Sequence, residues 1–395
     1  MSKIIKKTGV LSGLKSNVGK RRSEPLWTGP CGEGPNGGIT QSMINTLLVC
    51  KERGRVKYIE GLQPSLDFSP RMEYGQLWHT CEEALAKNSK KLKYPYIDNP
   101  WEAPLKSYAQ RLCLLHPLSQ EEIEKWYNVC KVQFSIYVDY WSKHTEVVTR
   151  TPLLQEQTFD IPYTLPSSRV VRLRGKFDSV DLIDQGKSGG IYLQENKTKG
   201  EINEIQMQRQ LKFDLQTMLY LIALKEGQHG INAVQSWPEQ FNDYNVKGVR
   251  YNVIRRPLSG GKGSIKQLQG SKNKPAETKQ EYYSRLQQYF IDDPEYWFMR
   301  WKVEISDKDI EKFKLKFLNP FLEHVCDWYD FITTGKIVKT SSNSLHWVTP
   351  YGLYNILAEG GTTEYDSYLE TGNEIGLTRI DKLFKELQYC TLVSV

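Results

Sequence analysis

The chain has 395 residues, 39% of them hydrophobic and 25% charged, which is enough apolar material to bury a large core. The longest uninterrupted apolar run, residues 218–224, is far too short to span a bilayer, and the first residues lack the apolar stretch of a secretory signal. The seven cysteines contain no Cys-x-x-Cys pair, which argues against a zinc finger and favours a reducing, cytoplasmic setting. The composition therefore favours a soluble enzyme without a membrane partner.

The net charge of +7 originates in the first 22 residues, which contain basic side chains and no acidic one. These basic residues are Lys3, Lys6, Lys7, Lys15, Lys20, Arg21 and Arg22. Residues 28–38 are rich in glycine and proline, so we predict a flexible basic tail over residues 1–37. Such a tail can bind the phosphate backbone of a nucleic acid, or it can simply keep the chain soluble.

A helix is predicted over residues 70–87. Gly75, His79 and Glu83 recur every four residues, so they project from one side of this helix. A histidine in such a place is more often a packing or surface residue. Neutral imidazole is also a common metal ligand, and a carboxylate one turn away could orient it.

Residues 170–183 and 190–197 predict a β-hairpin, with a turn signal between them. Glu195 and Lys197 are two residues apart and point to one face, while Asn196 points away. Asp178 on the neighbouring strand can reach the same place. Two converging carboxylates repel each other unless a cation lies between them, and such oxygen ligands suit Mg²⁺ or Mn²⁺. Solvated charges beside a turn would give the same pattern.

Downstream, residues 201–227 predict one long helix, on which Gln216 and Tyr220 share a face beside an apolar stripe. Residues 246–256 then predict another strand. This gives the order strand, strand, helix, strand. Further on, we expect a strand over residues 296–306 and a helix over residues 307–334, capped by Ser306 and kinked at Pro320.

Four motifs in this order resemble the RecB-type branch of the PD-(D/E)XK nucleases. They are G-x-x-x-H-x-x-x-E from Gly75 to Glu83, G-x-x-D from Gly175 to Asp178, E-x-K from Glu195 to Lys197, and Q-x-x-x-Y from Gln216 to Tyr220. The resemblance extends over residues 38–257. It implies an α/β fold with a mixed sheet flanked by helices, preceded by an N-terminal helical segment and followed by a C-terminal α+β extension.

The resemblance also implies roles for individual residues. His79, Asp178 and Glu195 would hold the metal, helped by the backbone carbonyl of Asn196, and Lys197 would act on the nucleophilic water. Gln216 and Tyr220 would support the site and contact the nucleic acid. Glu83 would orient His79 or bind the metal through water.

Many RecB-type nucleases hold an iron–sulfur cluster with one cysteine near the start of the domain and three closely spaced cysteines near its end. Cys50 stands at the first position, but only Cys326 and Cys390, far apart, lie near the end of this chain. A complete four-thiolate cluster is therefore not expected. Cys50 is interpreted as a packed thiol, and phage-type relatives without the cluster are the nearer comparison.

We expect four segments: a basic tail (1–37), the nuclease domain (38–257), a basic loop (258–282) and a C-terminal extension packed on the core (283–395). Around the loop, DNA contacts are expected from Arg255, Arg256, Lys262 and Lys266, although a disordered insertion would have the same composition. No chemistry can be assigned to the stretch after Thr334. Aromatic packing in this stretch could replace the iron–sulfur cluster that closes the domain in relatives.

The residues and the resemblance together predict an Mg²⁺- or Mn²⁺-dependent exonuclease that processes DNA ends in recombination or replication. Such an enzyme would be encoded by a phage or mobile element and act in the bacterial cytoplasm. An endonuclease on the same site, or a nucleic-acid-binding scaffold that has lost turnover, remains open. The chain lacks a G-x-x-x-x-G-K-[ST] loop, so a helicase would be a separate partner, as would a single-strand annealing protein.

Overall fold

The computed structural model describes residues 24–64, 68–88, 99–144, 150–183, 189–211, 214–228, 244–258, 264–272, 274–334 and 377–385. Two compact units divide the chain. The first comprises Met1–Gly37, Ser42–Ser65 and Val325–Lys385, and the second comprises Gly38–Gln41, Leu66–His324 and Glu386–Val395. Residues 1–23 of the predicted basic tail, Lys262 and the stretch 335–376 lie outside the described residues, so the predictions made for them stay predictions. Residues 24–37, the rest of that predicted tail, are described, and Leu26 and Trp27 are buried.

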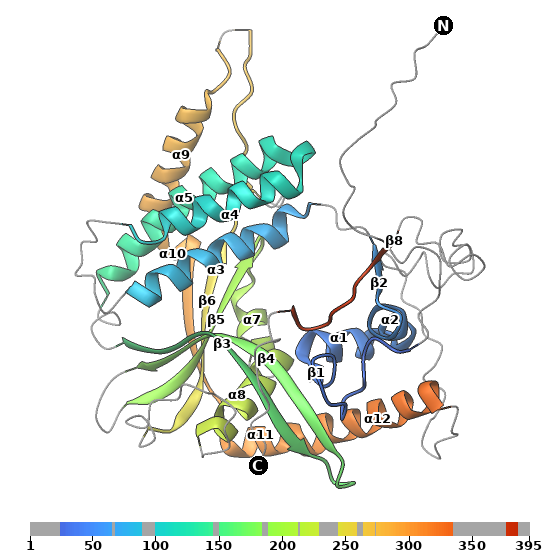
Figure 1. The fold of residues 1–395 in the computed structure, drawn as a ribbon. Helices are drawn as coiled ribbons and strands as arrows, with labels where there is room; N and C mark the ends of the chain where they lie inside the picture. The colour runs from blue at the N-terminus through green and yellow to red at the C-terminus, as the bar shows by residue number, and fades with distance from the viewer. Residues whose placement is uncertain are drawn as a thin grey trace, which may run out of the picture. The chain divides into compact units, whose positions relative to one another are not determined.

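The second unit is built on a six-stranded mixed sheet, which confirms the predicted fold class (Figure 1). Its strands are β1 (Ile39–Thr40), β3 (Arg150–Thr164), β4 (Val170–Ile183), β5 (Gly190–Lys199), β6 (Val246–Arg255) and β7 (Phe298–Glu304). The order is β1-β4-β5-β6-β7, with β3 also paired to β4. The pairs β1–β4 and β5–β6 are parallel, and the other pairs are antiparallel.

Four helices form a layer on one side of this sheet (Figure 1). They are α3 (Pro70–Asn88), α4 (Glu102–Leu115), α5 (Gln120–Ser142) and α9 (Lys279–Asp292). Their core is aromatic: the Trp78 ring meets Phe134 at 4.9 Å and Tyr137 at 5.0 Å, both edge to face. Edge-to-face pairs add to the free energy of burying large rings. This layer holds α3, and with it His79, in place.

The other face of the sheet carries α8 (Leu215–Gln228). Thr217 of α8 hydrogen-bonds the Tyr251 hydroxyl, whereas Tyr137 of α5 bonds the next residue, Asn252. Because successive side chains of a strand point to opposite faces, α5 and α8 lie on opposite sides of β6.

The prediction of a single helix over residues 201–227 is wrong. The chain forms two helices, α7 (Glu204–Leu211) and α8, and Asp214 between them is not helical. Asp214 explains the new start. Its Oδ2 accepts hydrogen bonds from the backbone N of Thr217 at 3.0 Å and from the Thr217 hydroxyl at 3.1 Å. A carboxylate that satisfies free N–H groups in this way begins a helix.

The region after β6 follows the predicted pattern with two differences. A short helix, α10 (Pro294–Trp297), precedes β7, so the strand begins later than predicted. The predicted helix over residues 307–334 consists of α11 (Asp307–Phe313), a π-helical turn (Lys314–Leu318) and α12 (Asn319–Thr334). Ser306 caps α11 as expected, since its hydroxyl accepts from the backbone N of Asp309 at 3.2 Å.

The first unit contains α1 (Gln41–Val49), α2 (Lys51–Gly54), a π-helical turn (Arg55–Ile59), and β2 (Leu62–Pro64) paired antiparallel with β8 (Leu377–Arg379). Within it, the Tyr329 ring packs edge to face on Trp27 at 5.2 Å. Cys50 is buried just after α1. None of the helices among the described residues has the length and apolarity needed to cross a membrane.

Candidate metal-dependent active site

The two acidic residues predicted from the hairpin meet where β4 and β5 separate. The ladder between these strands runs from Ile183 opposite Gly190 to Ser179 opposite Gln194, and Asp178 and Glu195 follow directly. Asp178 bridges the opening, because its Oδ2 accepts a hydrogen bond from the backbone N of Asn196 at 3.1 Å. The fork therefore brings both carboxylates to the end of one ladder.

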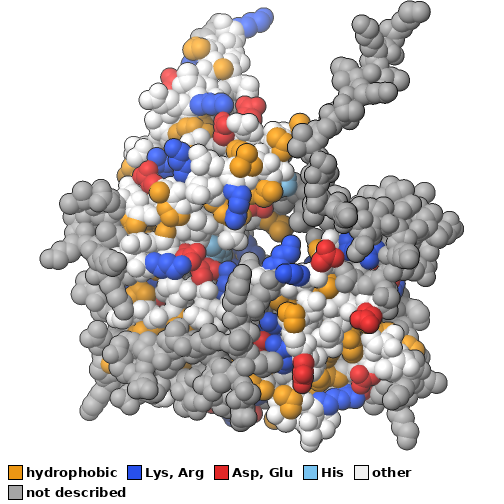
Figure 2. Space-filling model, viewed as in Figure 1, with side chains coloured by type: hydrophobic (Ala, Val, Ile, Leu, Met, Phe, Trp, Pro, Cys, Tyr) orange, Lys and Arg blue, Asp and Glu red, His pale blue; other side chains and the backbone are white. Residues whose placement is uncertain are grey.

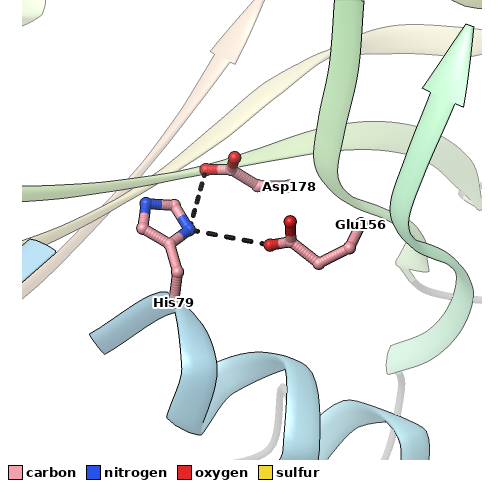
Figure 3. Close-up of side chains that lie close together, drawn as sticks. All are labelled: His79, Glu156 and Asp178. Carbon is pink, nitrogen blue, oxygen red and sulfur yellow. Dashed lines mark ion pairs between the residues drawn. The ribbon is translucent and has the colours of Figure 1, made fainter. Parts of the chain in front are cut away.

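The predicted histidine reaches this fork from α3 (Figure 3). His79 Nδ1 lies 3.6 Å from Asp178 Oδ2 and 3.8 Å from Glu156 Oε1. One ligand atom from each of these three residues lies within 4.8 Å of the other two. Three converging donors of this kind, one imidazole and two carboxylates, suit a divalent cation.

Glu156 is a member of this cluster that sequence reasoning missed. On β3, Gln155 pairs with Ser179 and Gln157 with Phe177, which places Glu156 opposite Asp178. A signal existed: the β3–β4 hairpin keeps one register from Thr164 and Val170 down to this level. Counting outward from the turn of that hairpin would have brought Glu156 to Asp178.

The backbone of Glu156 is left-handed, with φ 48°. A residue other than glycine rarely adopts this conformation within a strand, and it costs free energy. Here it accompanies a carboxylate that turns toward His79, as Figure 3 shows. Glu156 Oε2 also lies 2.6 Å from Lys176 Nζ.

Lys197 of β5 and two residues of α8, Gln216 and Tyr220, complete the site beside Glu195. Lys197 Nζ lies 2.9 Å from Glu195 Oε2 and donates a hydrogen bond of 2.8 Å to Gln216 Oε1. One turn further along α8, Tyr220 packs edge to face on Phe177, with ring centroids 5.7 Å apart. The four predicted residues Glu195, Lys197, Gln216 and Tyr220 thus lie together.

The proton affinities of the site follow from burial and from the close packing of charges. Burial raises the pKa of Glu195 to about 7, although the adjacent Lys197 acts in the opposite direction. Burial alone would lower the pKa of His79, but Asp178 and Glu156 raise it to about 9. The pKa of Lys197 is also raised, because Glu195 and Asp178 outweigh its burial. In the absence of metal, protons and ammonium groups balance the clustered carboxylates.

A divalent cation fits these residues on a direct structural criterion. Glu195 is fully buried, and its Oε1 has no hydrogen-bond partner among the described residues. A buried carboxylate oxygen without a partner is costly unless a cation completes it. His79, Glu156 and Asp178 form one group of donors, and Glu195 follows opposite Asp178 where the β4–β5 ladder ends, so a metal bound at this fork would complete Glu195 Oε1.

The remaining predicted residues lie elsewhere. Glu83 forms an ion pair with Lys87, so its role toward His79 stays a prediction. Arg255 is buried with its guanidinium 3.9 Å from the Tyr296 ring, and Arg256 donates a hydrogen bond of 2.8 Å to the Arg71 carbonyl. Lys266 is exposed in the segment of residues 264–278 after β6, here called the arm.

A strand fork with converging acids, an adjacent lysine and a histidine from a neighbouring helix defines a metal-dependent phosphodiesterase of the nuclease type. The comparison with family models agrees: the model of the PD-(D/E)XK nuclease superfamily matches residues 39–300, well over half of the chain. The chain belongs to this superfamily, whose members act on nucleic acids. A comparison with curated proteins gives no match.

Proposed function

We propose that this chain is an Mg²⁺- or Mn²⁺-dependent DNA exonuclease of the RecB type, similar to those of phages, that processes DNA ends. The observation that carries the proposal is the fork at Asp178 and Glu195, where one Glu195 oxygen has no partner among the described residues and the other contacts Lys197. His79, Glu156, Asp178, Glu195 and the carbonyl of Asn196 would hold the metal. No other group of side chains in the described part of the chain combines these features.

The bound cation would lower the pKa of a water molecule and neutralise charge that develops on the scissile phosphate. The protein supplies the positioning. Gln216 Oε1 and Glu195 Oε2 both contact the Lys197 ammonium, so it stays charged and points to one place. From there it can orient the attacking water or bind a phosphate oxygen. Tyr220 packs edge to face on the ring of Phe177, the residue before Asp178.

Basic side chains outside the cluster would hold the DNA backbone. The arm of residues 264–278 extends beyond α9, and Figure 2 shows Lys or Arg side chains at its outer end. Lys266, Lys272 and Lys274 are exposed along it. Its base is braced by Arg285, whose Nε lies 2.6 Å from Glu277 Oε1. Because Arg255 is buried against Tyr296, we assign binding of the DNA backbone to this arm and to the basic tail rather than to Arg255.

The main alternative is an endonuclease on the same site, and a second is a scaffold without turnover. The complete acid, acid and lysine set favours catalysis over the scaffold. A helicase or single-strand annealing protein would be a separate partner. We further propose that the protein acts in the cytoplasm of a bacterial host, without an iron–sulfur cluster.

The test is digestion of end-labelled linear duplex, single-stranded and closed circular DNA with Mg²⁺, Mn²⁺ or EDTA. We expect metal-dependent loss of linear DNA only, and its absence in Asp178→Ala and Glu195→Ala. These two variants should still bind DNA, which gel shifts in EDTA would check. Cutting of the circle would replace the exonuclease with the endonuclease, and activity in either variant would overturn the site.

A further inference from the structure

A buried polar cluster lies behind the active-site strand, on the face of the sheet that α3 and α5 cover. Its centre is Asn252 of β6, which is fully buried. Asn252 stands beside Asn196 in the parallel register of β5 and β6. Asn196, between Glu195 and Lys197, directs its side chain to this rear face and is only 5% exposed.

The Asn252 side chain connects β6 to four other elements. Its Nδ2 lies 2.9 Å from Asn196 Oδ1, 2.7 Å from the Tyr137 hydroxyl and 3.1 Å from Glu82 Oε1. On its other side, Asn252 Oδ1 accepts from Arg300 Nε at 3.3 Å. Strands β5, β6 and β7 and helices α3 and α5 therefore meet at one amide.

Ordinary packing would place apolar side chains at this depth, because each buried polar group needs partners to offset its lost hydration. Here an amide and a carboxylate are buried together beside the half-buried guanidinium of Arg300, and they contact one another through hydrogen bonds. The cluster borders the aromatic core through Tyr137, whose ring packs edge to face on Trp78. Within the described residues, the cluster reaches the active site through the Asn196 side chain.

That link bears on catalysis through the backbone of Asn196. The N–H of Asn196 donates to Asp178 Oδ2 at 3.1 Å, and its carbonyl is one of the expected metal ligands. The ladder between β4 and β5 has already ended at this level, so no strand pairing on that side fixes the orientation of the peptide. A hydrogen bond from Asn252 to the Asn196 side chain would fix it from behind.

We propose that Asn252 is a positioning residue of the metal site, which holds Asn196 so that its peptide group orients Asp178 and faces the cation. This inference rests on the proposed function, since it needs a divalent metal at the fork. Outer partners of metal ligands commonly change metal affinity by about 10- to 100-fold. Asn252 acts one residue further away, through Asn196.

The experiment measures Mn²⁺ binding to the full-length protein without DNA, by calorimetry, for Asn252→Ala, Asn196→Ala and the double variant. We expect each single variant to bind Mn²⁺ about tenfold more weakly. Because both substitutions break the same link, the double variant should bind no more weakly than the weaker single variant. Circular dichroism and thermal melting would establish that each variant folds.

Tyr137→Phe is the matched control. It removes a hydrogen bond from the same cluster but leaves the Asn196–Asn252 pair, so it should lower the melting temperature while Mn²⁺ affinity stays within about threefold of wild type. A folded Asn252→Ala that binds Mn²⁺ normally would overturn the inference alone. If Asn252→Ala does not fold, normal binding by Asn196→Ala would do the same. Wild-type protein that fails to bind Mn²⁺ would overturn the metal site and this inference together.

Discussion

At the scale of single residues, the metal-free active site holds a proton on His79 that a metal must displace when it binds. His79 faces two carboxylates, Asp178 and Glu156, and their charges raise its pKa to about 9 in spite of its burial. The imidazolium therefore stabilises the metal-free fold. That contribution is fully present below the ordinary histidine pKa of 6.5 and is lost as the pH rises through about 9.

This protonation predicts that metal binding tightens as the pH rises. The metal needs neutral imidazole, so binding must release the His79 proton, and with a pKa of about 9 affinity should increase roughly 25-fold between about pH 7 and about pH 8.5. Calorimetry with Mg²⁺ in two buffers of different ionisation enthalpy would count the protons released. The control is His79→Gln, which should bind more weakly and show a flatter pH dependence. An unchanged affinity across this range in the wild type would refute His79 as a ligand.

At the scale of elements, the sequence predicted the fork but not everything that enters it. Alternation along β5 was sufficient to place Glu195 and Lys197 on one face, and their hairpin partner Asp178 followed from the register. Helical spacing likewise placed Gln216 and Tyr220 together. Each of these inferences uses only contacts within one element or across one turn, where side-chain direction follows from the repeat of the backbone.

The predictions failed where a local departure from regular geometry decides the structure. No strand was predicted over residues 150–164, so Glu156 was not counted against Asp178. Its left-handed backbone also has no signature in Gln155-Glu156-Gln157, because such a conformation is held by its surroundings rather than by its residue type. Asp214 begins a new helix inside a segment without proline, whose glycine, Gly227, lies at its end. The buried cluster at Asn252 could not be foreseen either, since it joins residues far apart in the chain.

The left-handed backbone at Glu156 predicts that two substitutions weaken metal binding alike but differ in stability. Glu156→Gly and Glu156→Ala both remove the carboxylate, and both should weaken Mn²⁺ binding about tenfold. Only alanine keeps the penalty of a left-handed backbone, so the glycine variant should be more stable than the alanine variant by about 1 kcal/mol. Urea unfolding in EDTA measures this difference. Equal stabilities would show that β3 relaxes to a regular conformation once the carboxylate is gone.

At the scale of the whole molecule, the charge is divided between parts that have different tasks. The first 22 residues carry seven basic side chains and no acidic one, while the rest of the chain is balanced. The active-site fork itself is rich in acidic groups, which repel the phosphates of a nucleic acid until a cation is present. A substrate with a charged backbone must therefore be attracted from elsewhere, either by the tail or by the exposed lysines of the arm.

Deletion of residues 1–22 should weaken DNA binding and reduce its dependence on salt. Each lost phosphate contact lowers the slope of log K against log salt by about 0.9 on duplex DNA, so several contacts would change it measurably. Fluorescence anisotropy in EDTA across a range of salt concentrations gives this slope without cleavage. A scrambled tail that keeps the seven charges should behave as wild type, because backbone recognition does not depend on their order. A deletion variant with the wild-type slope would instead assign binding of the DNA backbone to Lys266, Lys272 and Lys274, whose joint replacement by glutamine should then flatten the slope.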